Sequence, residues 1–446
     1  MKTNKVCIIG AGSSGIAACK VLQEYGIEFD CFEKGSKIGG NWRYNNDNGM
    51  SSAYWSLHIN TSRDKMCYSD FPMPSDYPDF PHHTQIIQYF EDYVDHFGFR
   101  DKIIFHTQVT EIWREADDTY TVATDRGVHQ NYRALIVANG HHWNPRFPEP
   151  PFPGHFEGEI MHSHFYKTPE IFQPNKNVVI LGIGNSALDI ACEAARTTRG
   201  SVVLSTRSGA HIVPKYILGV PLDQFGSREK TSFLPLSVQQ FLYKTLLNLS
   251  RGKQETYGVP TPKRKFLTEH PSISQDFLPL AGHGKIKVRP NIQRLNGKEV
   301  IFEDGSSAQA DILIYATGYK VSFPFFKNGM FDVEKDNDLQ LYHRVVHPDI
   351  PNLFFLGLVQ PLGAIMPIAE RQSQWIAKLL TGEVALPSKK YMNLKIRKIA
   401  EEVNRQYKQS PRHTLQVDFY VYMHQLKKEM QQMRTKEGKN ITPVSQ

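Results

Sequence analysis

A strand–turn–helix unit occurs twice in this chain. Residues 5–18 read KVCIIGAGSSGIAA, and residues 178–191 read VVILGIGNSALDIA. Each unit is a short apolar run, a glycine-rich turn and a helix start, the arrangement that binds a dinucleotide pyrophosphate. One such unit is a weak signal. Two in 446 residues predict an α/β fold with two Rossmann-like dinucleotide-binding domains.

The first unit ends in an acid. After Gly10, Gly12 and Gly15, the next predicted strand, IEFDCFEK, closes at Glu33. A carboxylate at this place accepts hydrogen bonds from ribose hydroxyls and repels a 2′-phosphate. The first unit therefore favours an unphosphorylated adenosine ribose, as in FAD or NAD.

The second unit differs at the ribose end. Its turn and the end of its next strand carry Gly182, Gly184 and Ala187, then Thr206, Arg207 and Ser208. An arginine between two hydroxyls suits the 2′-phosphate of NADPH, although Arg207 also fits a solvated loop. Together the two units indicate a flavoprotein that NADPH reduces.

Further candidate cofactor-binding residues follow from the same units and their surroundings: Ser14, Gly40, Asn41, Trp42, Val109, Asn185, Ser186 and Gly318. Paired glycines at 39–40 let the backbone approach a flavin. Trp42 fits either a place beside the flavin ring or ordinary core packing. The stretches ANGH (138–141) and ATGY (316–319) each close a buried strand where the chain crosses between domains.

The remaining pattern is that of a two-domain protein. Residues 41–84 are predicted as loops over a site, residues 83–98 as an amphipathic helix, and the proline-dense stretch 141–154 as a domain connection. Residues 285–305 are predicted as strand, turn and strand. The tail beyond 385 is predicted helical, then disordered after about 432.

Composition excludes several classes. The net charge is +7 without a long basic block, so no nucleic-acid partner is expected. No apolar run approaches the roughly 20 residues that span a bilayer, and a cytoplasmic, soluble protein is expected. The five cysteines form no CxxC pair, which argues against an NADPH-dependent disulfide reductase. The histidines lack metal-ligand spacing, so no metal site is expected.

A motif between the two units carries a family resemblance. FEGEIMHSHFY reads F-x-G-x-x-x-H-x-x-x-Y, with Phe156, Gly158, His162 and Tyr166. This signature, with NTSRDKMCYSDFPMPSDYP, LGLVQPLGAIMP and HTLQVDFYVYM, resembles the flavin-containing monooxygenases, class B flavoprotein monooxygenases of the animal type, over residues 4 to 425. The related Baeyer–Villiger group ends the motif in Trp.

The resemblance implies an NADPH domain inserted into a larger FAD domain. The expected boundaries are 1–165 and 301–446 for the FAD domain, with its helical tail, and 166–300 for the NADPH domain. The charged tail departs from many animal members, and no membrane anchor is expected from it. A homodimer stays open.

The resemblance also implies a reaction. NADPH reduces the flavin, O2 forms a C4a-hydroperoxyflavin, and a tertiary amine nitrogen or thioether sulfur is oxygenated. Asn60 matches the family's active-site asparagine, and Gln360 a position near the flavin. His162 and Tyr166 are expected to set the domain link and the nicotinamide position rather than to act as acid and base. The alternatives are a Baeyer–Villiger monooxygenase acting on ketones, an NADPH oxidase, and a non-enzymatic flavin-binding sensor.

Overall fold

The computed structural model of the protein describes residues 4–224, 228–231, 233–262, 265–267, 270–327, 330–331, 339–406 and 415–432. The chain divides into two compact units. Unit 1 comprises Met1–Ser51, Thr61–Asn144 and Lys320–Gln446, and unit 2 comprises Ser52–Asn60 and Pro145–Tyr319. The predicted disorder after 432 lies outside the described residues.

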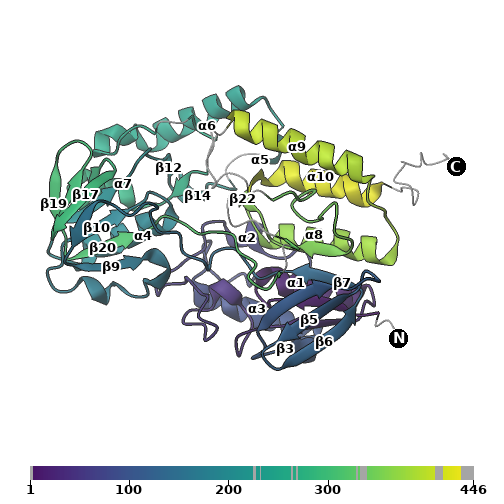
Figure 1. Ribbon diagram of the computed structural model, residues 1–446. Helices are drawn as coiled ribbons and strands as arrows, with labels where there is room; N and C mark the ends of the chain where they lie inside the picture. Colours follow the sequence, from purple (N-terminus) through teal and green to yellow (C-terminus); the bar gives the residue numbers. More distant parts are fainter. Residues whose placement is uncertain are drawn as a thin grey trace. The chain divides into compact units, whose positions relative to one another are not determined.

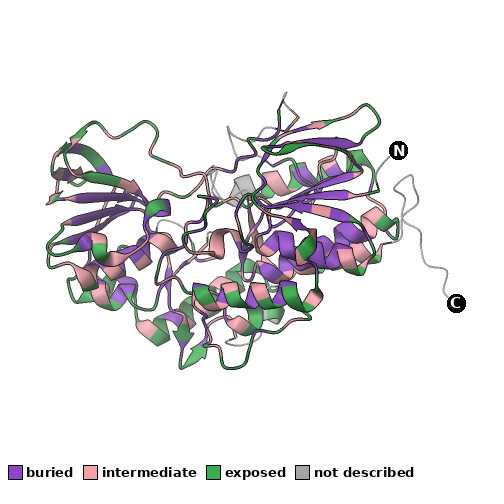
Figure 2. Cartoon of the chain, turned by 90° about the horizontal axis from the view of Figure 1, so that it is seen from below, coloured by how far each residue is buried: buried purple, intermediate pink, exposed green. Residues whose placement is uncertain are grey.

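Unit 1 is built on a five-stranded parallel sheet (Figure 1). Its strands, in spatial order, are β21 (Leu353–Phe355), β7 (Ala134–Val137), β1 (Val6–Ile9), β2 (Phe29–Phe32) and β3 (Ile103–Ile104). β1 and β7 are buried along their whole length, as expected for parallel strands covered on both faces. Figure 2 shows this burial as purple along the central strands.

Helices and a small antiparallel sheet complete unit 1. The helices are α1 (Ser13–Glu24), α2 (Arg63–Met66), α3 (His83–Phe97), α8 (Met366–Thr381), α9 (Lys389–Gln406) and α10 (Phe419–Gln431), with short 3₁₀ turns η1 (Gly40–Trp42) and η2 (Arg100–Lys102). The antiparallel sheet is β4 (Val109–Arg114), β5 (Tyr120–Thr124) and β6 (Gly127–Tyr132), and β22 (Gln360–Leu362) pairs with β23 (Gln416–Asp418).

Local sequence explains where the helix predicted at 83–98 begins and ends. The Gln85 side chain accepts a hydrogen bond from the His82 backbone N–H at 3.0 Å, which completes a capping box. Gly98 then ends α3 at φ +65°, a conformation that glycine adopts easily.

Unit 2 has the same kind of parallel sheet. Its strands, in spatial order, are β16 (Lys287–Arg289), β11 (Val202–Ser205), β10 (Val178–Leu181), β20 (Ile312–Tyr315) and β9 (Glu159–His162). A second sheet has the order β19 (Ser307–Gln309), β18 (Glu299–Phe302), β17 (Ile292–Gly297) and β8 (Gly154–Phe156). Apolar side chains of β10, β11 and β20 pack with those of β17 and β18 into one core cluster.

Helices and short pairings complete unit 2. The helices are α4 (Asn185–Thr197), α5 (Arg228–Thr231), α6 (Leu236–Arg251) and α7 (Phe277–Gly282), with η3 (Ser163–Phe165), η4 (Pro169–Phe172) and η5 (Gln254–Tyr257). The short strand pairs are β12 (Ile212–Val213) with β15 (Ser272–Ile273), and β13 (Tyr216–Ile217) with β14 (Val220–Pro221).

The unit bounds differ from the domain boundaries predicted at 165/166 and 300/301. Unit 2 runs from Pro145 to Tyr319, because β8 and β9 at one end and β20 at the other pair within its sheets. The predicted connection at 141–154 contains the change-over at 144/145. Which nucleotide each unit binds stays a prediction.

The stretch 285–305 forms three strands instead of the predicted two. β16 pairs with β11 in the parallel sheet, whereas β17 and β18 form an antiparallel hairpin in the second sheet. Pro290 stands between β16 and β17 and offers no backbone N–H to a ladder, so the chain changes sheets there.

Candidate functional site

The glycine turn after β1 requires glycine at two of its positions, 10 and 15. Gly10 has φ +95°, and a Cβ built on it would lie 2.8 Å from the carbonyl oxygen of Ala138. A Cβ on Gly15 would lie 1.8 Å from the carbonyl oxygen of Gly10. The turn and the first residues of α1 therefore pack backbone against backbone, as the fold of a dinucleotide site requires.

The N-terminus of α1 is open to an anion. Gly12 is the N-cap, no side chain caps the helix there, and its first turn holds no acidic residue. The paired glycines approach this point, since a Cβ on Gly40 would lie 3.0 Å from the Cα of Gly12. Gly39 N–H also donates to the carbonyl oxygen of Ala11 at 3.0 Å. Two glycine turns thus line one backbone surface at a helix N-terminus.

Glu33 joins the end of β2 to this turn. It is 3% exposed, and its carboxylate accepts hydrogen bonds from the backbone N–H groups of Ala11 and Gly35, both at 2.8 Å. The Asn48 side chain donates to it at 3.3 Å. A carboxylate has about four lone-pair sites, so one more donor, such as a ribose hydroxyl, can still be accepted.

The segment that holds Asn41 and Trp42 is tied down by side chains that follow it. Asn46 Nδ2 donates to the carbonyl oxygen of Gly40 at 3.0 Å, and Ser51 Oγ donates to that of Asn41 at 2.8 Å. Trp42 ends the 3₁₀ turn η1 and is partly buried. The sequence did not single out Asn46, Asn48 or Ser51, although their clustering after the glycine pair is typical of a hydrogen-bonded loop.

The C-terminal part of unit 1 packs against the first turn of α1. A Cβ on Gly357 would lie 2.1 Å from Ser14 Oγ, so the segment after β21 passes directly over the first turn of α1. Gln372 on α8 accepts from Gly357 N–H at 2.9 Å and donates to Tyr422 Oη at 2.7 Å. Gln360 begins β22, three residues after Gly357.

Val109 begins β4 and is buried at 9% exposure.

The second glycine turn, after β10, is as tight as the first. Gly182 has φ +133°, and a Cβ on it would lie 2.4 Å from the carbonyl oxygen of Ala316. Gly184 is the N-cap of α4, with no capping side chain and no acid in the first turn. Ala187 is fully buried, so its methyl group belongs to the core.

The ribose end of the second unit lies where β11 stops. Thr206 is buried and its Oγ1 accepts from Gly209 N–H at 3.1 Å, whereas Arg207 is exposed and Ser208 is partly buried. Asn185 serves the fold, because its side-chain oxygen accepts from Ile273 N–H at 2.8 Å.

Ser186 lies in the first turn of α4 and is partly buried. Gly318 follows β20 at φ +83° and accepts from Arg146 N–H at 2.9 Å.

The signature residues lie on β8, β9 and the turn after them. Phe156 ends β8, and Gly158 is required because a Cβ there would lie 2.5 Å from the carbonyl oxygen of Asp311. His162 ends β9, and its Nδ1 accepts from His164 N–H at 3.1 Å.

The signature histidine is held neutral. Burial and the neighbouring His164 lower the pKa of His162 to about 4, although the backbone of Gly318 favours the charged form. The imidazole is therefore neutral near pH 7 and carries no acidic imidazolium proton there, and its positioning role stays a prediction.

Asn60 ends a segment with an unexpected place in the fold. Residues 52–60, called the strap below, belong to unit 2, although the chain on both sides of them belongs to unit 1. Trp55 N–H donates to the carbonyl oxygen of Lys167 at 2.8 Å, and Lys215 Nζ donates to that of Ile59 at 3.1 Å. Asn60 itself is partly buried.

Comparison with known proteins decides the family. A family model described as "Flavin-binding monooxygenase-like" matches residues 3–436. The chain belongs to this family. It is 37% identical to Flavin-containing monooxygenase 5 of Rattus norvegicus over 96% of this chain and 82% of the relative. It is 34% identical to Dimethylaniline monooxygenase [N-oxide-forming] 2 of Mus musculus, over 95% and 82%.

A solved structure agrees with this assignment. The structure of S-allyl-L-cysteine S-oxygenase from Allium sativum is similar with a TM-score of 0.71 and 26% identity, covering 96% of this chain and 88% of that one. This chain is therefore an oxidoreductase enzyme, a flavin-containing monooxygenase. Its fold is the family's two-domain α/β fold.

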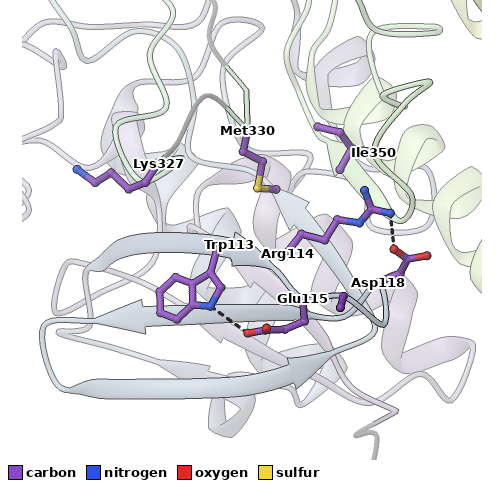
Figure 3. A pocket seen from close by; sticks show the side chains of 8 residues that line it. Trp113, Arg114, Glu115, Asp118, Lys327, Met330 and Ile350 are labelled. Atoms are coloured by element: carbon purple, nitrogen blue, oxygen red, sulfur yellow. Dashed lines mark hydrogen bonds and ion pairs between the residues drawn. The ribbon is translucent and has the colours of Figure 1, made fainter.

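The structure also has a hollow of about 570 Å³ in unit 1 (Figure 3). It is lined by Trp113, Arg114, Glu115, Ala116, Asp118, Lys327, Met330 and Ile350. Trp113 donates to Glu115 at 2.9 Å, and Arg114 pairs with Asp118, so its polar groups already serve each other. None of the candidate site residues lines this hollow. The candidate site is therefore defined by the glycine turns and not by the hollow.

Two further properties concern the described part of the chain. None of its helices is both long and apolar enough to cross a membrane. Its His, Cys, Asp and Glu side chains form no group of three or more that could hold a metal ion.

Proposed function

We propose that this monooxygenase binds FAD on the glycine turn of unit 1 and NADPH on that of unit 2. The observation that carries the proposal is the contrast between the two ribose ends. Glu33 places a buried carboxylate beside the first turn, whereas exposed Arg207 follows the corresponding strand of the second. A carboxylate repels the 2′-phosphate that a guanidinium attracts, so the two turns select different dinucleotides.

The residues of unit 1 fit FAD. The surface formed by Gly12 and Gly40 has no side chains, so backbone N–H groups can reach the pyrophosphate at the N-terminus of α1. Glu33 would hold the adenosine ribose, with Ser14, Asn41, Trp42, Val109 and Gln360 as the further candidate contacts. FAD held by these residues would supply the hydride acceptor for NADPH and the centre that activates O2.

The residues of unit 2 fit NADPH. The N-terminus of α4 at Gly184 is uncapped and would take the pyrophosphate. Arg207 and Ser208 would take the 2′-phosphate. Asn185 holds β15 in place, and Thr206 closes its own turn, so both would shape the site more than they contact the nucleotide.

Asn60 is the proposed catalytic residue. Its neutral amide can donate a hydrogen bond to an oxygen atom at the flavin without titrating between pH 5 and 9. The reaction asks for little acid–base chemistry, and a neutral donor in a water-poor site suits it. His162, held neutral, and Tyr166 would order the region around the nicotinamide.

The proposed substrate is a soft nucleophile, an amine nitrogen or a thioether sulfur. Two similar proteins support it: the relative from Mus musculus that is named as N-oxide-forming, and the S-oxygenase from Allium sativum. Tyr166 in place of the Trp of Baeyer–Villiger enzymes argues against ketones as the main substrates.

Stopped-flow absorbance tests the proposal. The FAD-loaded enzyme is reduced with NADPH without oxygen and then mixed with oxygenated buffer. A long-lived band of neither oxidised nor reduced flavin, discharged faster by trimethylamine or a thioether than by a ketone, is expected. Immediate return of oxidised flavin with one hydrogen peroxide per NADPH, whatever substrate is present, would identify an NADPH oxidase instead.

A further inference from the structure

The strap is held to unit 2 along its whole length. At its start Ser52 bonds the side chain of Tyr319, and the carbonyl oxygen of Ala53 accepts from Lys167 Nζ at 3.0 Å. At its end, Lys215 Nζ donates a hydrogen bond to the carbonyl oxygen of Ile59. In a nine-residue segment without a helix or strand, such contacts are what fixes the backbone.

Two carboxylates on α4 hold the middle of the strap. Asp189 and Glu193 are four residues apart, so they lie on one face of the helix. Tyr54 Oη donates to Asp189, and Ser56 Oγ donates to Glu193. Burial raises the pKa of both carboxyl groups above their ordinary values. Both acids therefore serve the strap rather than solvent.

Glu193 has a second partner, the signature tyrosine. Tyr166 is fully buried and its hydroxyl donates to Glu193. Its ring packs 5.9 Å from that of Tyr54 and 5.6 Å from that of Phe172, centroid to centroid. The ring contacts need only an aromatic side chain, whereas the carboxylate needs the hydroxyl. Phenylalanine at 166 would keep the first and lose the second.

We propose that Tyr166 is a positioning residue, which fixes the strap on α4 through Glu193 and thereby sets the place of Asn60. Tyr54 does the same through Asp189. The hydrogen bonds that hold the strap on α4 through Asp189 and Glu193 are called the clamp below. The inference rests on the proposed role of Asn60 only for its effect on the reaction, because the clamp itself is a property of the fold. It also ties the strap to the helix whose first turn, at Gly184, is the proposed NADPH pyrophosphate site.

Hydrogen exchange tests the clamp without any reaction. Peptides covering residues 54–60 are compared in the wild-type protein and in Tyr166→Phe and Tyr54→Phe. The amides of Trp55 and Leu57, which bond Lys167 and Tyr54 in the native strap, should exchange roughly five- to tenfold faster, as expected for one lost hydrogen bond. The matched control is Tyr257→Phe, which removes the 2.8 Å bond to the Arg251 carbonyl in the same unit.

Two outcomes of the exchange experiment would contradict the proposed clamp. Unchanged exchange in 54–60 would overturn it. Faster exchange throughout unit 2, including β10 and α4, would show a general loss of stability and would overturn a specific positioning role. Faster exchange confined to the strap, and absent in the Tyr257→Phe control, supports it.

A double-mutant cycle links the clamp to the reaction. The fraction of NADPH electrons released as hydrogen peroxide is measured for Tyr166→Phe, Asn60→Ala and the double variant. If Tyr166 acts by placing Asn60, the Tyr166→Phe substitution alone should raise peroxide release severalfold. In the Asn60→Ala background the same substitution should cause no further increase. Full additivity would overturn the link. If Asn60→Ala leaves peroxide release unchanged, the proposed role of Asn60 fails, while strap exchange still decides the clamp.

Discussion

The carboxylate of Glu33 accepts a hydrogen bond from the backbone N–H of Ala11 at 2.8 Å. This bond joins the end of β2 to the first glycine turn, 22 residues earlier in the chain. Because Glu33 also accepts from Gly35 N–H, one side chain fixes both the turn and the loop that follows β2. The residue proposed to bind the ribose thus also shapes the backbone around the pyrophosphate.

Replacing Glu33 should therefore remove the flavin. In Glu33→Ala we expect FAD to bind at least tenfold more weakly, since hydrogen bonds to a charged group contribute about 1.5–3 kcal/mol each. The ratio of flavin to protein absorbance after purification measures this. Glu28→Ala, an exposed acid just before β2, is the control and should keep its flavin. Full flavin occupancy in Glu33→Ala would contradict the assignment.

Replacing two glycines of the same turn by alanine should have different effects. A Cβ on Gly15 would lie 1.8 Å from backbone, whereas the nearest heavy atom to a Cβ on Gly12 is 3.7 Å away. Gly15→Ala should thus lose the native fold of unit 1. Gly12→Ala should keep it but bind FAD poorly, because the methyl group occupies the pyrophosphate approach. Circular dichroism melting and flavin absorbance separate the two effects, and a flavin-replete Gly12→Ala enzyme would argue against the proposed site.

Arg207 should determine the choice of nucleotide. Arg207→Ala should raise the KM for NADPH roughly 10- to 100-fold, the loss expected for a charged phosphate contact, and leave that for NADH nearly unchanged. The reduction rate of bound flavin with each nucleotide checks this. Arg199→Ala, an exposed arginine before β11 instead of after it, is the control. Equal losses with NADPH and NADH would mean that Arg207 does not read the 2′-phosphate.

His162 should be neutral throughout the working pH range. Its pKa is lowered to about 4, so the folded state binds fewer protons than the unfolded state between that value and about 6.5. Stability should then fall as pH drops through this window, and His162→Asn should flatten the fall. Denaturant unfolding at pH 4.5 and 7 measures it, with exposed His155→Asn as the comparison. An unchanged slope would show that His162 is accessible to protons in the folded chain.

Asp189 should have the opposite pH dependence. Burial raises its pKa, so the folded state holds the proton longer than the unfolded state, and stability is lost as pH rises from the ordinary aspartate range through the raised value. Asp189→Asn can still accept from Tyr54 and should reduce this loss. Thermal unfolding at a series of pH values from 4 to 8 checks it. If Asp189→Asn lost more stability relative to the wild-type protein as the pH rose, the prediction would be wrong.

Local patterns made the two glycine turns predictable. A strand of four apolar residues, glycines where φ is positive and an acid closing the next strand depend on neighbours in sequence, as at Gly10 and Glu33. The helix predicted at 83–98 rests on the same kind of local signal, because Ile86, Phe90 and Val94 recur on one face, and all three are buried in α3.

The strap could not be predicted in this way. Its partners Asp189 and Glu193 lie more than 130 residues later, and an irregular segment has no period that indicates which core it joins. The helix pattern does not point to the strap either, because the two acids share the face of α4 that also carries Ser186 and Arg196, which is typical of a solvent-exposed face.

The strap makes the chain cross between the units four times, at 51/52, 60/61, 144/145 and 319/320. A chimera that exchanges only Pro145–Tyr319 with a relative would therefore pair the donor's α4 with the recipient's strap. Tyr54 and Ser56 of the strap would meet carboxylates that did not evolve with them. Recombination that respects this fold must move residues 52–60 together with the inserted segment, as two pieces of one inherited block.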